Sequence, residues 1–164
     1  MPQNYFNLVS KFKSDLDNIA ELSWHEEKTK NYVISKLGKP YWSKKTAIIY
    51  KIGKGAPVFF RAELDGLKTV RGVRHTCGHS AHLAALMGAH RYFRKNPPEN
   101  FCIYFVFQPS EESWPSGAKF ISDNFPELRN CRAGFAFHVD PDLKRGALAD
   151  AMFASGDYFE VKII

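Results

Sequence analysis

Cysteine is scarce in this sequence, which has only Cys77, Cys102 and Cys131 among its 164 residues. The three residues form neither a Cys-x-x-Cys pair nor an even-numbered disulfide framework, so a disulfide-stapled secreted domain is not expected. Cys102 and Cys131 lie in or beside apolar segments, where small buried thiols are the usual finding. We therefore expect a reduced, cytoplasmic protein.

Long apolar runs and blocks of basic charge are also missing. No segment approaches the length of a membrane span, and the N-terminus carries charges where a secretory signal needs an apolar run. The 23 Lys and Arg exceed the 17 Asp and Glu by six, yet they are dispersed without a block of five. We expect no membrane and no nucleic-acid partner, and a solvated basic surface that helps to attract an anionic substrate.

What is present is the composition of one ordinary globular domain, with 45% hydrophobic and 24% charged residues. Apolar residues recur at helical spacing from Tyr5 to Leu22. Ser23 and Glu26 have the spacing of a capping box and would begin a second helix that ends at Gly38. Further apolar runs predict strands at 46–52, 58–64, 101–107, 133–137, 146–149 and 158–164, with helices at 81–92 and 117–124. This order predicts an α/β domain with a mostly parallel sheet flanked by helices.

One octapeptide, His75-Thr76-Cys77-Gly78-His79-Ser80-Ala81-His82, gathers three imidazoles and a thiol before an apolar helix. A bend at Gly78 would direct Cys77 and His79 at a single ion, and these side chains suit a borderline-soft divalent metal. A small buried thiol with solvated histidines explains the octapeptide alone equally well.

Polar residues follow three of the apolar strands. Their placement favours a metal site over the alternative of a buried thiol with solvated histidines. Asp65, the Glu111–Glu112 pair and His138 each come directly after a strand, where ligands gather in α/β sheets. Adjacent glutamates point in different directions, so one can hold a metal while the other transfers protons. A pair of ions would share the ligand set Cys77, His79, Glu112 and His138. These residues favour metal-assisted hydrolysis over a structural zinc site, which would be closed by Cys and His alone.

Several motifs in order carry a family resemblance. They are Arg61-Ala62-Glu63-Leu64-Asp65-Gly66-Leu67, the octapeptide, Phe107-Gln108-Pro109-Ser110-Glu111-Glu112 and His138-Val139-Asp140-Pro141. The sequence resembles the N-acyl amino acid amidohydrolases, the hippurate hydrolase and indole-acetyl-amino acid hydrolase group. This group belongs to the dinuclear metallo-exopeptidase superfamily, which includes aminoacylase and carboxypeptidase.

The resemblance implies an activity and a role for each residue. It implies hydrolysis of an N-acyl amino acid with zinc or manganese, two ions in a complete site, as cofactor. Glu111 falls on the general acid/base and Asp65 on a carboxylate that orients the site. His75 and His82 are expected either to support the ligands or to lie on the helix face, and neither is expected to bind metal. The metal-ligand positions are Cys77, His79, Glu112 and His138.

The sequence also departs from the family pattern. Ser80 and Glu63 stand where the family has Asp, and the chain ends at Ile164 with less than half of the family's length. By the resemblance, residues 1–157 are the N-terminal part of an incomplete zinc-exopeptidase-like catalytic domain, and 158–164 begin a strand that leads to an absent dimerisation domain. The alternative function is therefore a truncated, inactive amidohydrolase that at most binds metal or a partner chain. An incomplete sheet edge predicts oligomerisation or a complementing chain.

Overall fold

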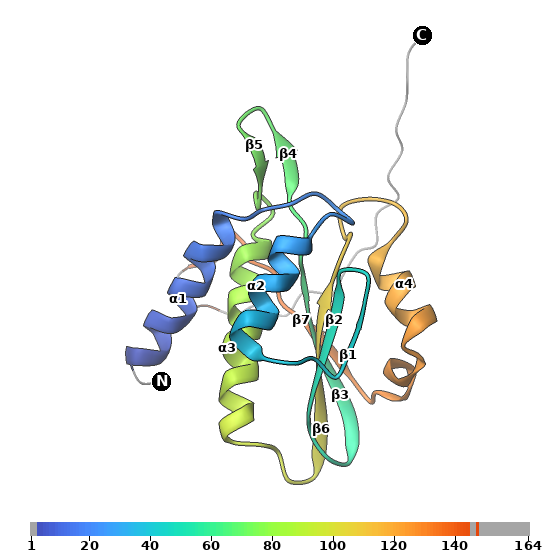
Figure 1. Cartoon of the computed structure of the whole chain (residues 1–164). Coiled ribbons are helices and arrows are strands. Elements are labelled where there is room, and N and C mark those ends of the chain that lie inside the picture. Colours follow the sequence, from blue (N-terminus) through green and yellow to red (C-terminus); the bar gives the residue numbers. More distant parts are fainter. Residues whose placement is uncertain (1–2, 145–146, 148–164) are drawn as a thin grey trace.

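A five-stranded sheet forms the centre of the molecule in the computed structural model, which describes residues 3–144 and 147 (Figure 1). The strand order is β1 (Trp42–Lys44), β2 (Ala47–Gly53), β6 (Phe101–Gln108), β3 (Ala56–Glu63) and β7 (Gly134–Ala136). One side of the sheet is covered by α1 (Gln3–Asp17), α2 (Glu27–Leu37) and α3 (His79–Lys95). The other side carries α4 (Gly117–Asn124) and the 3-10 helix η1 (Pro126–Asn130). A separate hairpin consists of β4 (Leu67–Thr69) and β5 (Gly72–Arg74).

Strand β6 lies between the two hydrophobic cores. Alternate side chains of a strand point to opposite faces, so a strand covered on both faces needs apolar residues throughout. Ile103, Phe105 and Phe107 join the core beneath α1–α3, whereas Tyr104 and Val106 join the core beneath α4. The continuous apolar run at 101–107 therefore predicted this buried strand correctly.

The α/β class is confirmed, but the sheet is mixed rather than mostly parallel. β3 pairs in parallel with β6 and β7, whereas β1–β2 and β2–β6 are antiparallel. The reason is the short turn between β2 and β3, where Gly53 and Gly55 have φ of 87° and 107°. This turn reverses the chain, and β6 then inserts between the two strands and runs parallel to β3.

The topology brings several loops to one edge of the sheet. The carboxyl ends of β3, β6 and β7 share a direction because these strands are parallel. The chain leaves β3 for α3 on one face and leaves β6 for α4 on the other (Figure 1). Neighbouring strands whose connections diverge in this way open a crevice at their carboxyl ends, which is where ligands bind in α/β folds.

The predicted capping box at Ser23 was wrong. Helix α2 begins at Glu27, and its N-cap residue is Glu26, whose own side chain makes no capping hydrogen bond. The Ser23 hydroxyl instead donates a hydrogen bond to Asp65 Oδ2 at 2.6 Å. The first helix also ends earlier than predicted, at Asp17. The apolar patterns gave no indication of the short elements β1, β4, β5 and η1.

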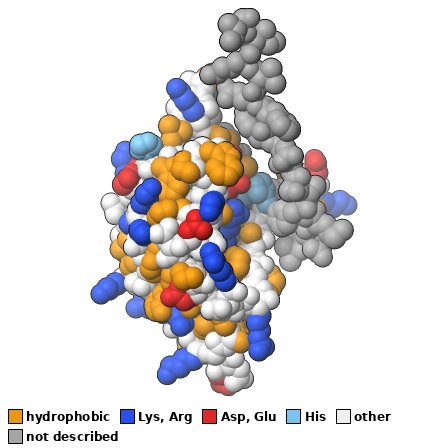
Figure 2. Space-filling view, turned by 90° about the vertical axis from the view of Figure 1, so that its right-hand side faces the viewer, with side chains coloured by type: hydrophobic (Ala, Val, Ile, Leu, Met, Phe, Trp, Pro, Cys, Tyr) orange, Lys and Arg blue, Asp and Glu red, His pale blue; other side chains and the backbone are white. Residues whose placement is uncertain are grey.

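Two predicted strands cannot be compared with the structure. The segment 158–164 and the assignment of its boundary with 1–157 lie outside the described residues, as does 146–149 apart from residue 147. Within the described part, no helix is both long and apolar enough to cross a membrane. On the face that Figure 2 shows, Lys and Arg side chains are scattered among apolar ones and do not form one continuous patch.

His90 gives the fold a measurable pH dependence. The side chain is only 3% exposed, and its ring packs against Tyr50 and Phe105 at centroid distances of 4.7 and 5.2 Å. Burial, together with the charges of Arg94 and Arg91, lowers the pKa of His90 to about 4. The unfolded chain therefore binds a proton on this residue at a higher pH than the folded chain does.

We predict that the free energy of unfolding falls as the pH drops from about 6.5 toward 4, because protonation of His90 favours the unfolded state. Between pH 7 and pH 5 this residue should remove about 2 kcal/mol. The change is measured by urea denaturation at both pH values. His90→Phe, which keeps an aromatic ring, should lose less stability over this interval; equal losses in both proteins would contradict the prediction.

Candidate metal centre

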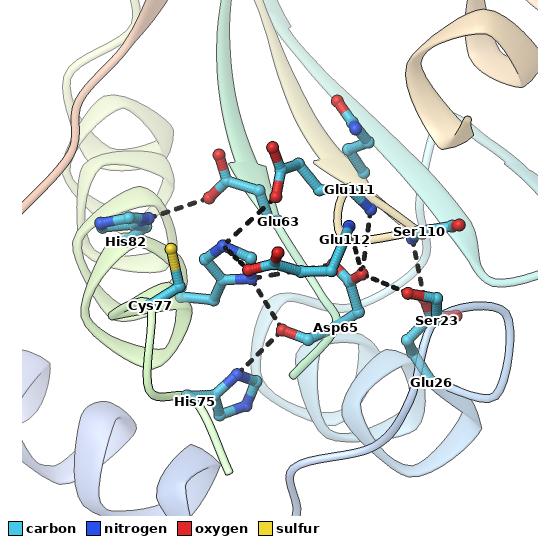
Figure 3. A network of polar contacts seen from close by, with 12 residues as sticks. Ser23, Glu26, Glu63, Asp65, His75, Cys77, His82, Ser110, Glu111 and Glu112 are labelled. Carbon is cyan, nitrogen blue, oxygen red and sulfur yellow. Dashed lines mark hydrogen bonds and ion pairs between the residues drawn. The ribbon is translucent and has the colours of Figure 1, made fainter. Parts of the chain in front are cut away.

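The turn before α3 positions two of the predicted ligands. Gly78 is the N-cap of α3 and has a left-handed backbone with φ of 90°. A Cβ atom at this position would lie 2.3 Å from Cγ2 of Val139, so only glycine fits. The tight turn places Cys77 and His79 on either side of Gly78, and the ligand atoms of both lie close to Glu112, which follows β6. Figure 3 shows Cys77 near Glu112.

The predicted metal-binding residues come together in the structure. Cys77, His79 and Glu112 each offer a ligand atom, and these atoms lie within 4.8 Å of one another. His79 Nε2 is 3.6 Å from Glu112 Oε1 and 3.7 Å from Glu111 Oε2. His138 joins the group, with its Nε2 3.4 Å from Cys77 Sγ. The structure thus gathers side chains that are separated by up to 61 residues in the sequence.

Asp65 is fully buried and connects the loops of this group. Its Oδ2 accepts hydrogen bonds from the backbone N–H groups of Glu111 and Glu112, both at 3.0 Å, and from the Ser23 hydroxyl. Its backbone oxygen lies 2.7 Å from Nδ1 of His79. Asp65 therefore holds the backbone of the loop after β6 and the ring of His79 in place.

The contact between His79 and Asp65 determines the tautomer of the imidazole. Because the Asp65 backbone oxygen can only accept, the neighbouring Nδ1 of His79 carries the proton. Nε2 of a neutral ring is then bare and faces the carboxylates of Glu111 and Glu112. Glu112 Oε1 is buried and has no hydrogen-bond partner among the described residues. An imidazole lone pair that faces two carboxylates is a set of donor atoms that fits a divalent metal.

The electrostatics of the site agree with this reading. Burial, followed by the charge of Glu112, raises the pKa of Glu111. Burial and the charge of Glu112 also raise the pKa of the Cys77 thiol to about 11. The raised pKa values of Glu111 and Cys77 both result from burial and from the negative charge of neighbouring carboxylates. A bound cation would compensate this negative charge.

A second group, Glu63, His79 and His82, also has ligand-like spacing. Both ring nitrogens of His82 are already engaged, however, because Nδ1 lies 2.9 Å from Glu63 Oε2 and Nε2 accepts the N–H of Val139 at 3.1 Å. Arg61 also donates to Glu63. Burial alone would raise the pKa of Glu63, but the His82 hydrogen bond and the Arg61 charge lower it to about 2. This group is therefore a saturated hydrogen-bond network beside the candidate metal centre.

His75 is not one of the residues whose ligand atoms meet in the cluster of Cys77, His79 and Glu112. Its Nδ1 lies 3.0 Å from the backbone oxygen of Asp65, and its Nε2 has no hydrogen-bond partner among the described residues. Sequence reasoning missed the contribution of Ser23 and Glu26, which contact the loops of the site. The spacing of Ser23 and Glu26 is that of a capping box, and no pattern in the sequence distinguished a helix cap from a pair of residues that hold the site loops.

Comparisons with known proteins identify relatives with related chemistry. Residues 59–159 match the profile of peptidase family M20/M25/M40. An N-acetyldiaminopimelate deacetylase of Leuconostoc mesenteroides is 31% identical over 99% of this chain and 49% of its own length. An IAA-amino acid hydrolase ILR1-like 4 of Arabidopsis thaliana is 29% identical over 98% of this chain and 41% of its own length.

A solved structure agrees with the fold. The YXEP protein of Bacillus subtilis, described as a dinuclear metal-binding peptidase of the M20 family, superposes with a TM-score of 0.78 at 25% identity. The match covers 86% of this chain and 45% of that protein, so the chain spans about half of the relatives that it matches. The matched profile covers more than half of the sequence and includes every predicted site residue. The chain belongs to peptidase family M20/M25/M40.

Proposed function

We propose that this chain carries the site of a metal-dependent amidohydrolase that cleaves the amide bond of N-acyl amino acids. The observation that carries the proposal is the position of His79 Nε2, which faces the carboxylates of Glu111 and Glu112 beside Cys77 and His138. The names of the two relatives, a deacetylase of an N-acetylated amino acid and an amino acid conjugate hydrolase, support this substrate class.

Four side chains would hold the metal: Cys77, His79, Glu112 and His138. Their thiolate, imidazole and carboxylate groups suit zinc or manganese, and the thiolate favours zinc. Two ions are proposed because the matched YXEP protein is described as dinuclear. The bound metal would lower the pKa of a water molecule and polarise the substrate carbonyl.

Glu111 would transfer protons during hydrolysis. Its backbone N–H is held by Asp65, while its carboxylate stands beside His79 and is 38% exposed. The raised pKa of Glu111 brings the group closer to neutral pH, which suits a residue that takes a proton from water and returns it to the leaving nitrogen. Asp65 would act through the loop that it orients rather than on the substrate.

Metal content tests the ligand set. Purified protein incubated with zinc should retain near-stoichiometric metal after dialysis, as measured by inductively coupled plasma mass spectrometry. Cys77→Ser and His79→Ala should each lose most of this metal, because each removes a donor atom. Cys131→Ser is a matched thiol control away from the cluster; unchanged metal in Cys77→Ser and His79→Ala would refute the assignment.

The role of Glu111 is tested by hydrolysis of N-acetyl or N-benzoyl amino acids. Glu111→Gln should lower kcat by roughly 10²- to 10⁴-fold, the usual contribution of a general acid/base, while metal remains bound. Glu99→Gln changes an exposed glutamate and should leave the rate unaltered. Equal rates for Glu111→Gln and the wild type would contradict the role. Metal binding without turnover in the wild type would favour the alternative of an inactive metal-binding chain.

A further inference from the structure

Glu26 is a buried carboxylate that the chemistry described above does not use. Its side chain is 0% exposed, and Oε1 accepts the backbone N–H groups of Trp24 at 2.8 Å and Ser110 at 2.9 Å. Oε2 accepts the hydroxyl of Thr46 at 2.7 Å. None of these three donors is a cation, although a buried carboxylate is costly without one. Since Glu26 does not cap α2 through its side chain, the buried carboxylate has another role.

One partner of Glu26 is Ser110, which directly precedes the two site glutamates in the loop between β6 and α4. Ser110 is fully buried and has a left-handed backbone with φ of 44°. Residues other than glycine rarely adopt this conformation. The next two N–H groups, those of Glu111 and Glu112, are both held by Asp65. Three successive amides of the loop are thus bound by two carboxylates, from residues 26 and 65.

The residues around Glu26 contact the same loop at further points. Trp24, whose φ of 67° is also left-handed, donates its Nε1–H to the backbone oxygen of Pro115 at 2.8 Å. Ser23 donates to Asp65, the carboxylate that holds the following amides. Figure 3 shows Ser23, Glu26 and Asp65 gathered on one side of the loop, with the Glu111 and Glu112 side chains beyond it. The segment 23–26 therefore supports the loop at its beginning and at its end.

We infer that Glu26 is a positioning residue, whose acceptor oxygen fixes the Ser110 backbone and thereby aims Glu111 and Glu112 at His79. The inference rests on the proposed function for the metal that Glu112 holds, but its effect on the loop can be measured without metal. Without this acceptor, the Ser110 N–H is buried and unpaired, and the backbone relaxes away from the left-handed conformation.

Glu26→Leu removes the acceptor, and Glu26→Gln is the conservative rescue. Gln keeps an oxygen for the Trp24 and Ser110 amides and offers its NH₂ group to the Thr46 hydroxyl, so it should restore the loop. Glu21→Leu is the matched control because Glu21 also accepts two amides, those of Lys28 and Thr29, but at the start of α2 and away from the loop.

Hydrogen exchange of the metal-free protein is the first measurement. Amides of residues 110–112 should exchange roughly tenfold faster, or more, in Glu26→Leu than in the wild type, and near the wild-type rate in Glu26→Gln. Glu21→Leu should leave them unchanged. Equal protection in Glu26→Leu and the wild type, or equal loss in Glu21→Leu, would overturn the inference.

Cobalt titration is the second measurement, because Co²⁺ reports its ligands by absorbance. Glu26→Leu should weaken Co²⁺ binding by about 10- to 100-fold, the usual cost of disturbing a residue behind a ligand. Its thiolate-to-cobalt absorption should persist at saturation, since Cys77 lies outside the loop. Glu26→Gln should bind like the wild type. Failure of Gln to rescue would overturn the acceptor role, whereas a wild type that binds no cobalt would overturn the proposed function and leave the exchange rates to decide the inference.

Discussion

The hydrogen bonds of Asp65 are the constraint on which the site depends. Its backbone oxygen fixes the tautomer of His79, and its carboxylate holds the amides that follow β6. One buried residue at the end of β3 thus determines which nitrogen of the imidazole is free and which glutamates that nitrogen meets. Removing it would leave three donors unpaired in a desolvated site, so the geometry of the site and local stability are coupled at this position.

The sheet supplies the rigid frame for these contacts. Parallel pairing of β3 with β6 and β7 brings the carboxyl ends of three strands to one edge of the sheet, and the chain continues to α3 and α4 on opposite faces. His82 connects the sheet to the segment that carries His138. Its ring contacts Glu63 on β3 and the backbone of Val139, the residue after His138. The Glu63 side chain, which stands where the family has Asp, is therefore compatible with an ordered network.

Much of this arrangement could be predicted from the sequence, because buried strands have strong apolar patterns. The continuous run at 101–107 identified β6, and the polar residues after each strand identified the edge where Cys77, His79, Glu112 and His138 gather. The direction of β2 could not be predicted, since it depends on where β6 inserts rather than on local sequence. The roles of Ser23 and Glu26 were missed because long-range hydrogen bonds override a local capping pattern.

The central claim is that a thiolate, imidazoles and a carboxylate from separate loops bind one metal centre. X-ray absorption spectroscopy of the zinc-loaded protein tests it most directly. The account predicts a sulfur scatterer at about 2.3 Å together with nitrogen and oxygen ligands at about 2.0–2.1 Å. A spectrum with oxygen and nitrogen ligands alone, and no sulfur, would contradict the claim that Cys77 and His79 meet at the same ion.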